Sequence, residues 1–256
     1  MRVLKIGGNE LSDAGFVELL GANVAHLQAE TGSPLVIVHG GGRAIAGLQA
    51  QLGLETVKVD GLRVTNLESL NVAQMVLSGH SNKIVVKGLL AAGVDALGVS
   101  GVDGGLLRCR KKEHATADLG YVGEIVEVRR DLLETLMGIG VTVVLSPISL
   151  GLDGLTYNVN ADEAAAAAAL ACEAEELVFI SNVPGVLHED VVIPVLTARQ
   201  VEAHIEDGTI EGGMIPKVRS ALQAVESGVA RARIVNLAGL LANGGTIIVA
   251  GDNSGI

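Results

Sequence analysis

Short runs of apolar and β-branched residues recur along the chain and predict buried β-strands. In several of these runs the apolar residues are consecutive and do not alternate with polar ones. Such runs are expected where both faces of a strand are covered, as in a largely parallel sheet. The predicted strands are 3–6, 35–38, 96–99, 141–145, 177–180, 233–235 and 246–249.

Helix-length segments lie between these strands. In the segment 16–30, Phe16, Leu20, Val24 and Leu27 are spaced so that they fall on one side of a helix. Because strands and helices alternate over the whole length, we expect a three-layer α/β sandwich with helices on both faces of one sheet. The other predicted helices are 43–52, 67–77, 83–92, 162–172 and 217–227.

The segment 103–128 differs from the rest of the chain. It is more polar, contains several glycines and shows no helix-length apolar periodicity. We expect β-hairpins or a lid here, and not another strand–helix crossover.

Composition narrows the classes of protein that fit this pattern. The 256 residues are 49% apolar, which supplies a substantial core for one large domain or two lobes sharing a sheet. Aromatic residues make up 2%, Trp is absent and the net charge is −11, which argues against a nucleic-acid partner. A local group of Lys side chains could still attract a small anion.

Cysteine content and apolar run length indicate the compartment. Cys109 and Cys172 are too few for a disulfide framework or a zinc site. The first residues lack the apolar core of a signal peptide, and the longest apolar run, 164–172, is too short to cross a bilayer. We therefore expect a soluble cytoplasmic protein with no membrane segment.

Two motifs directly follow predicted strands. Open α/β sheets bind ligands at the carboxyl ends of their strands. Lys5-Ile6-Gly7-Gly8-Asn9 places a cation beside two glycines that let a phosphoryl group approach the backbone; a simple tight turn explains it equally well. His39-Gly40-Gly41-Gly42-Arg43 opens a helix with exposed N–H groups, which suits a carboxylate or phosphoryl oxygen. A flexible connection is the alternative. We expect His39 to be a packed or hydrogen-bonded core residue and not a metal ligand.

Two further motifs carry polar side chains that suit a small acidic substrate. In Asp60-Gly61-Leu62-Arg63-Val64-Thr65, the Arg63 fork could bind a carboxylate, although an isolated loop Arg is usually only solvated. In Tyr157-Asn158-Val159-Asn160-Ala161-Asp162, one polar residue could simply cap the following helix. The motif holds more polar groups than a cap requires, so Asp162 could also hold lysines in position.

The last two motifs lie in the C-terminal third. Gly212-Gly213-Met214-Ile215-Pro216-Lys217-Val218 places Lys217 near a helix N-terminus, where a cation is unfavourable unless an anion binds there. Ser181-Asn182-Val183-Pro184-Gly185-Val186 is a polar turn after a buried strand, which could contact a nucleotide or be an ordinary turn. The Walker pattern and G-x-G-x-x-G are both absent, so any phosphate site must use other residues.

Taken together, the motifs resemble the amino acid kinase family. The resemblance runs in order from Lys5 to Gly245. It includes K-I-G-G, V-H-G-G-G, G-L-R-V-T, Asn82-Lys83, L-G-V-S-G-V-D-G, Y-V-G-E, N-V-N-A-D-E-A-A, S-N-V-P-G-V and G-G-M-I-P-K. G-L-R-V-T and N-V-N-A-D are most similar to the members that act on N-acetyl-L-glutamate. Asn66 and Asn182 depart from the family, which commonly has acidic residues at these places.

The resemblance implies a role for each motif. Lys5 and Lys217 would neutralise the phosphoryl group in flight, with hydrogen bonds from the backbone of Gly8 and Gly41, and Asp162 would orient both lysines. Four residues would hold the substrate: Gly41, Gly42, Arg63 and Asn158. ATP would be contacted by Ser181, Asn182, Val183, Pro184, Gly185, Val186, Thr209, Ile210 and Glu211.

The resemblance also implies the fold and the reaction. The expected fold has a central, mostly parallel eight-stranded sheet, an N-lobe of about 1–173 for the amino-acid substrate and a C-lobe of about 174–256 for ATP. The expected reaction converts N-acetyl-L-glutamate and ATP to N-acetyl-L-glutamyl 5-phosphate, in arginine biosynthesis. Mg²⁺ would be bound mainly through ATP phosphates, so no metal site built from protein residues is expected.

The expected assembly is a homodimer that arginine does not inhibit. The chain starts directly at its first predicted strand, whereas the arginine-inhibited hexamers of the family have an additional N-terminal helix. The chain therefore resembles the shorter, dimeric type.

Two alternatives stay open. The run Arg108, Arg110, Lys111 and Lys112 is unusually basic for an acidic chain. It is either a solvated hairpin or a docking patch for an acidic carrier protein, and the second interpretation favours a kinase of carrier-linked aminoadipate or glutamate. A non-catalytic amino-acid-sensing domain is the other alternative, against which the joint presence of Lys5, Asp162 and Lys217 argues.

Overall fold

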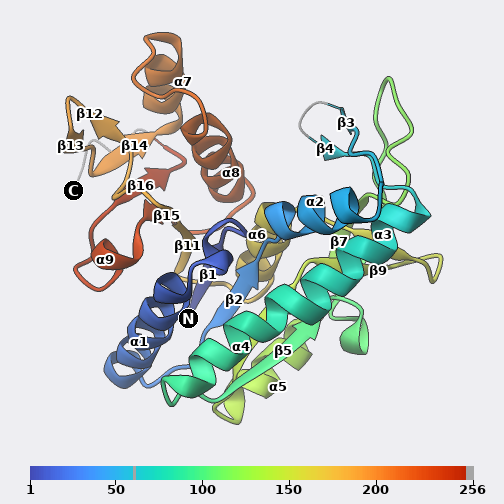
Figure 1. Ribbon diagram of the computed structural model, residues 1–256. Helices are drawn as coiled ribbons and strands as arrows, with labels where there is room; N and C mark the ends of the chain where they lie inside the picture. The colour runs from blue at the N-terminus through green and yellow to red at the C-terminus, as the bar shows by residue number, and fades with distance from the viewer. Residues whose placement is uncertain (60–61, 252–256) are drawn as a thin grey trace.

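A central eight-stranded sheet runs through the protein, whose computed structural model describes residues 1–59 and 62–251 (Figure 1). The strand order is β14-β16-β15-β11-β1-β2-β8-β5. The strands from β15 to β5 in that order are parallel, and β16 pairs antiparallel with β15. The strands are β1 (Arg2–Ile6), β2 (Val36–His39), β5 (Ala96–Ser100), β8 (Thr142–Ser146), β11 (Glu176–Ile180), β14 (Val195–Thr197), β15 (Ala232–Val235) and β16 (Thr246–Val249).

The mostly parallel sheet confirms the prediction, and all seven predicted strands are present. The short edge strand β14 was not predicted. Successive residues of the central strands enter opposite cores: Val3 and Val36 face one cluster, while Leu4 and Ile37 face the other. Two-sided burial is why these strands carry apolar residues at consecutive positions.

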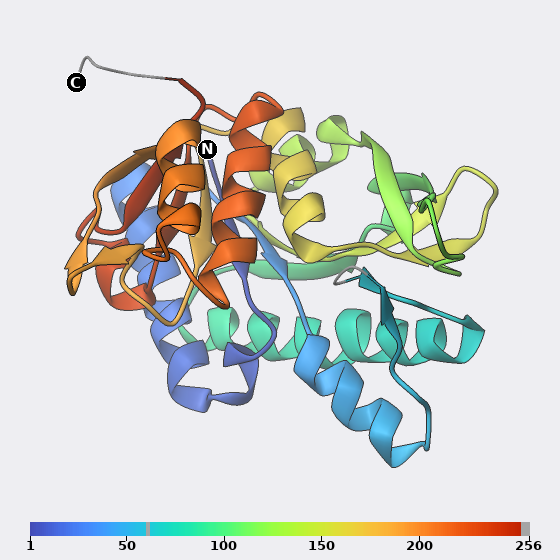
Figure 2. The same cartoon turned by 90° about the horizontal axis from the view of Figure 1, so that it is seen from above.

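Helices cover both faces of the sheet, as the view in Figure 2 shows. One face is covered by α1 (Ala14–Thr31), α4 (Asn82–Ala91) and α9 (Leu237–Leu240). The other is covered by α5 (Arg130–Gly138), α6 (Ala161–Ala171), α7 (Ala198–Glu206) and α8 (Met214–Glu226). On α6, Ala164, Ala165, Ala168 and Ala169 are fully buried, so this helix packs closely on β1 and β2.

A long helical run differs from the prediction. The segments 67–77 and 83–92 were predicted as separate helices, but α3 (Leu67–Gln74), the π-helical segment η2 (Met75–Ser81) and α4 follow one another without a break. The polar side chains that interrupt the apolar pattern make tertiary contacts: Ser78 bonds Ser146 at 2.9 Å, and Asn82 bonds His39 at 3.2 Å. Helix α2 (Gly42–Gln51) packs against α3 and η2.

The segment 103–128 contains a hairpin, as predicted. Strands β6 (Leu107–Lys111) and β7 (Gly123–Val128) pair antiparallel. They join β9 (Ile148–Gly151) and β10 (Thr156–Asn158) in a four-stranded sheet that was not predicted. The remaining short elements are η1 (Glu10–Ser12), β3 (Lys58–Val59), β4 (Leu62–Arg63), η3 (Asp103–Gly105), β12 (Leu187–His188) and β13 (Val191–Val192). Within the described part of the chain, no helix is long and apolar enough to span a membrane.

Candidate active site

The two glycine turns that follow β1 and β2 meet backbone against backbone. The Gly40 N–H donates to the Ile6 carbonyl at 3.0 Å. A Cβ atom added to Gly8 would lie 2.3 Å from both the Cα and the amide nitrogen of Gly41. A side chain at Gly8 therefore has no room, and the two predicted phosphoryl-contacting backbones are neighbours.

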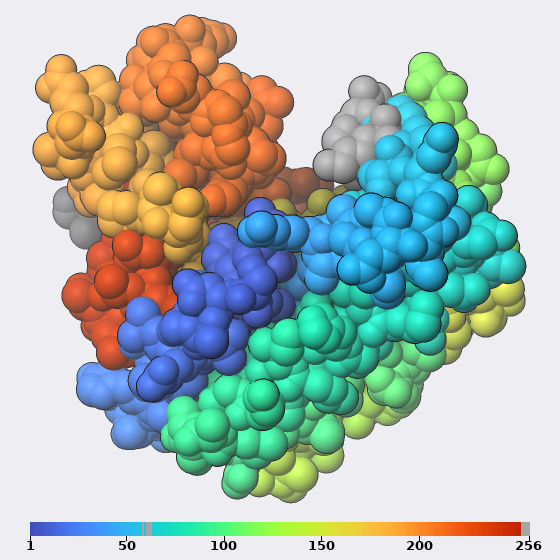
Figure 3. Space-filling model, in the orientation of Figure 1, coloured from blue at the N-terminus to red at the C-terminus, as the bar shows by residue number. Residues whose placement is uncertain are grey.

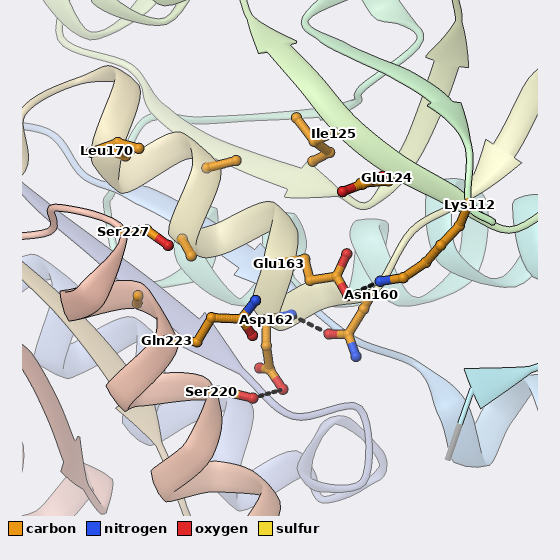
Figure 4. Close-up of a pocket in the computed structure, with 13 residues that line it drawn as sticks. Lys112, Glu124, Ile125, Asn160, Asp162, Glu163, Leu170, Ser220, Gln223 and Ser227 are labelled. Carbon is orange, nitrogen blue, oxygen red and sulfur yellow. Dashed lines mark hydrogen bonds and ion pairs between the residues drawn. The ribbon is translucent and has the colours of Figure 1, made fainter. Parts of the chain in front are cut away.

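Lys5 and Asp162 form an ion pair at this end of the sheet. The Lys5 Nζ lies 2.7 Å from Asp162 Oδ1. The Asn160 side chain caps α6 by accepting from the Asp162 N–H at 2.7 Å. Because Asn160 is the cap, the Asp162 carboxylate is available for Lys5 and for a 3.4 Å hydrogen bond from the Ser220 hydroxyl, which Figure 4 shows.

Lys217 reaches the same region from the first turn of α8. Its Nζ donates to the Ser181 hydroxyl at 2.7 Å and to Asn182 Oδ1 at 3.5 Å. Burial lowers the pKa of Lys217; the charge of Lys5 also lowers it, while Glu10 and Asp162 raise it. The two lysines and the two carboxylates are therefore within electrostatic reach of one another.

Glu10 was not predicted as a site residue. Its Oε2 is buried and has no hydrogen-bond partner among residues 1–59 and 62–251. The carboxylate folds back over the first glycine turn, since a Cβ on Gly7 would lie 2.3 Å from Oε2. The only sequence signal was an acidic residue close to K-I-G-G, which did not distinguish Glu10 from a solvated turn residue.

Arg63 is a partly buried cation whose hydrogen-bond partners among the described residues are neutral groups. Its Nη1 donates to Gln49 Oε1 and, at 3.2 Å, to the Thr56 hydroxyl, and its Nη2 donates to the Gly42 carbonyl at 3.5 Å. No described carboxylate forms an ion pair with it, and burial lowers its pKa. A desolvated cation without a counter-ion favours an anionic ligand. Asp60 and Gly61 of the same motif lie outside the described residues.

Asn158 lies at the end of β10, near the Arg63 strand. The segment after β4 hydrogen-bonds residues 119–121 through Thr65. The Asn158 N–H donates to the Tyr121 carbonyl at 2.9 Å. No described group hydrogen-bonds the Asn158 side-chain amide, so that amide is available to a ligand.

A hollow separates these two groups of residues. Figure 3 shows it between α7 and α8 on one side and the part that contains α2 on the other. Lys217 lies on α8, on the first side, and Arg63 lies on β4, on the second (Figure 1).

His39 contributes to the geometry of the second glycine turn. It is fully buried, and burial lowers its pKa to about 4, so its ring is neutral near pH 7. Its Nδ1 donates to the Gly40 carbonyl at 3.1 Å and its Nε2 accepts from Asn82 at 3.2 Å. The prediction of a hydrogen-bonded core histidine is confirmed.

Comparison with known proteins agrees with this geometry. Residues 1–236 match the amino acid kinase family. The chain belongs to this family.

Curated relatives resemble the chain over nearly its whole length. It is 51% identical to the acetylglutamate kinase of Roseiflexus castenholzii, over 98% of this chain and 95% of the relative. It is 48% identical to that of Chloroflexus aurantiacus, over 98% of each. Among solved structures, the Streptococcus mutans UA159 protein smu.665 superposes with a TM-score of 0.82 at 30% identity, over 98% of each chain.

In this amino acid kinase, the basic run of β6 is largely paired. Arg110 lies 3.1 Å from Glu124 and Lys111 lies 2.7 Å from Asp118, both in exposed positions. Lys112 lies 2.6 Å from Glu163 of α6, beside a cavity of about 310 Å³ that Asp162 also lines (Figure 4). These acids neutralise much of the charge that suggested a carrier-docking patch.

The residues of this amino acid kinase that were predicted to contact the nucleotide differ in solvent exposure. Ser181 is buried beside Lys217, Asn182 and Pro184 are exposed, and Val183 is partly buried. Glu211 is exposed, and Thr209 is partly buried, with its hydroxyl 3.4 Å from His188 Nδ1.

Besides Ser181, three more of the residues predicted to contact the nucleotide are buried. Gly185 is buried, and a Cβ on it would meet Thr246 at 2.8 Å. The side chains of Val186 and Ile210 are each 1% exposed and belong to the core. Their contacts with a nucleotide would have to use backbone atoms.

Proposed function

We propose that the chain transfers the γ-phosphoryl group of ATP to the side-chain carboxylate of N-acetyl-L-glutamate, which yields N-acetyl-L-glutamyl 5-phosphate for arginine biosynthesis. The observation that carries this proposal is that Lys5, Lys217 and the two glycine turns converge at one end of the sheet. The names of the curated relatives support the choice of substrate.

The site suits phosphoryl transfer between two anions. Lys5 and Lys217 would offset the charge on the transferring group, and the N–H groups of Gly8 and Gly41 would donate hydrogen bonds to it. Asp162 would hold Lys5 in place through their ion pair. The acceptor carboxylate is already ionised near pH 7, so the reaction requires no general base.

The substrate would lie on the side of the hollow that contains α2. Arg63 supplies a cation without a counter-ion among the described residues, and the unused Asn158 amide supplies further hydrogen bonds. Gly41 and Gly42 stand at the start of α2, where free N–H groups and the helix dipole favour a carboxylate.

ATP would lie against the C-terminal part. We assign the substrate lobe to residues 1–173 and the nucleotide lobe to residues 174–256, of which 252–256 lie outside the described residues. Ser181 and Asn182 hydrogen-bond Lys217, Val183 and Pro184 follow them in the same turn, and Glu211 is exposed on the loop before α8.

Mg²⁺ would accompany ATP and be bound mainly through its phosphates. In the described residues, no group of three or more His, Cys, Asp or Glu side chains is placed to hold a metal ion. The buried, unpartnered Oε2 of Glu10 is a hard carboxylate oxygen that fits such a cation beside the phosphates. Bound Mg²⁺ would neutralise phosphate charge.

We also propose a homodimer in the cytoplasm. The edge strand β5 pairs only with β8 among the described strands. Leu97 on β5 and Leu90 on α4, a helix that packs against β5, are exposed apolar residues, and a second copy would cover them. Both cysteines are free thiols, as is usual in a reducing compartment. Light scattering should give the mass of two chains.

The function is tested by coupled ADP release with four acceptors in parallel: N-acetyl-L-glutamate, glutamate, aspartate and carrier-linked aminoadipate. We expect rapid turnover only with N-acetyl-L-glutamate. Background activity with it, together with robust activity on the carrier-linked substrate, would replace this proposal with the carrier-dependent alternative. Absence of ADP release with every acceptor would favour an amino-acid-sensing domain.

A further inference from the structure

Gln49 is a buried amide in contact with Arg63. It lies near the end of α2 and is 1% exposed. Its Oε1 accepts from Arg63 and, at 3.1 Å, from the Thr56 hydroxyl, and its Nε2 donates to the Ser69 hydroxyl at 3.0 Å. The Arg63 guanidinium can only donate, so the oxygen of the amide must face it.

The position of Gln49 on α2 explains how it reaches Arg63. Gly42 and Gln49 are seven residues apart, about two helical turns, and so lie on the same side of the helix. Helical side chains lean toward the N-terminus, which brings the Gln49 amide closer to Gly42. Arg63 donates to both residues and is thereby fixed along α2, close to the helix N-terminus proposed to hold the substrate.

Ser69 fixes the orientation of the Gln49 amide from the other side. Ser69 lies in the first turn of α3, and its N–H donates to the Asn66 side chain at 2.8 Å. Asn66, which departs from the acidic residue common in the family, therefore caps α3. The arrangement links α3, α2 and β4 through one buried amide.

The neutrality of Gln49 decides what Arg63 is free to bind. An amide oxygen orients a guanidinium without cancelling its charge, whereas a carboxylate at the same place would become its counter-ion. We infer that Gln49 is a positioning and specificity-determining residue that orients Arg63 and, among the described residues, leaves its charge without a counter-ion and free for a substrate carboxylate. This inference rests on the proposed function.

The decisive variant is Gln49→Glu, which keeps the size of the side chain and supplies a competing carboxylate. The KM for N-acetyl-L-glutamate should rise roughly 10- to 100-fold, the range for loss of a charge-assisted hydrogen bond. Turnover at saturation and the KM for ATP should stay within about twofold. Gln51→Glu is the matched control, because it adds the same charge at an exposed position of α2, and its KM values should match the parent.

Two further measurements separate positioning from a folding defect. Calorimetric titration with N-acetyl-L-glutamate should show the same fold loss of affinity for Gln49→Glu, while its thermal midpoint stays near that of Gln51→Glu. In an Arg63→Ala background, Gln49→Glu should have no further effect on substrate affinity, because its partner is gone.

The outcomes are distinguishable. If the parent phosphorylates N-acetyl-L-glutamate and Gln49→Glu matches Gln51→Glu in KM, the inference about Gln49 is wrong and the proposed function stands. The inference is equally wrong if Gln49→Glu raises the KM for ATP as strongly, or if its effect persists without Arg63. A parent that neither binds nor phosphorylates N-acetyl-L-glutamate overturns both.

Discussion

The ammonium of Lys5 lies 2.7 Å from the carboxylate of Asp162. Lys5 is on β1 and Asp162 is in the first turn of α6, so the two residues are far apart along the chain. The α6 cap is provided by Asn160, so Asp162 is not needed to begin the helix. This pair fixes a cation beside the glycine turn that follows β1, where the phosphoryl group is proposed to pass.

Replacing Asp162 should therefore impair chemistry more than folding. In Asp162→Asn the amide retains the size of the side chain but no longer holds the Lys5 charge. We expect turnover to fall roughly 10- to 100-fold, as for loss of a charge-assisted hydrogen bond, with a thermal midpoint near that of the parent. Glu163→Gln is the control, because the neighbouring carboxylate pairs with Lys112 and not with Lys5; equal losses in both variants would contradict the proposed role.

Lys217→Ala should lower turnover about 100- to 1,000-fold, the usual cost of losing a group that stabilises transition-state charge. The KM for N-acetyl-L-glutamate should change only a few-fold, since the cation serves mainly the transition state. Lys87→Ala, at an exposed position of α4, should behave like the parent. Steady-state kinetics at saturating ATP provides the measurement, and unchanged turnover would remove Lys217 from the mechanism.

Glu10 should influence the alkaline limit of activity. Burial and the charge of Lys5 lower the pKa of Lys217, while Glu10 and Asp162 raise it; Ser181 and Asn182 are its neutral polar partners. Activity needs the protonated ammonium and should fall as pH rises through that pKa. In Glu10→Gln the pKa drops further, so the alkaline limb should move to lower pH. A limb that stays in place, or moves to higher pH, would show that Glu10 does not act on Lys217.

Gly8 should not tolerate a methyl group. Its added Cβ would approach backbone atoms of Gly41 to 2.3 Å, and backbone cannot move aside as a flexible side chain can. Gly8→Ala should cost about 1–3 kcal/mol of unfolding free energy, as overpacking does, and should abolish most activity. Gly47→Ala, where the added Cβ meets no atom within 4 Å, should be neutral or stabilising. Thermal unfolding and turnover of the two variants test the contrast.

The basic run Arg108–Lys112 should not be required for activity on free N-acetyl-L-glutamate. In Arg110→Glu/Lys111→Glu, the reversed charges face Glu124 and Asp118 at exposed positions, where ion pairs contribute little to stability. Turnover with N-acetyl-L-glutamate should stay within a few-fold of the parent. A crippled variant whose parent activity also weakens with salt would instead indicate electrostatic docking of a partner.

The sequence by itself determined which segments are strands and which motifs follow them, because both are local properties. Unbroken apolar runs indicated two-sided burial, and cations and glycines at strand ends indicated an anion site. Local sequence patterns did not predict every helix. Helix α7 was not predicted, although it begins with a capping box of Thr197 and Gln200. The helices α5 and α9 were missed as well.

Only the tertiary structure decided which side chains meet. The contacts of Lys5 with Asp162 and of Lys217 with Ser181 join elements distant along the chain, and the contact of Gln49 with Arg63 joins α2 to β4. Glu10 and Gln49 have no distinctive spacing, and their importance follows from burial and from the charge state of their neighbours. Pairings of this kind depend on how strands order within a sheet and how helices pack on it, and residue periodicity does not specify them.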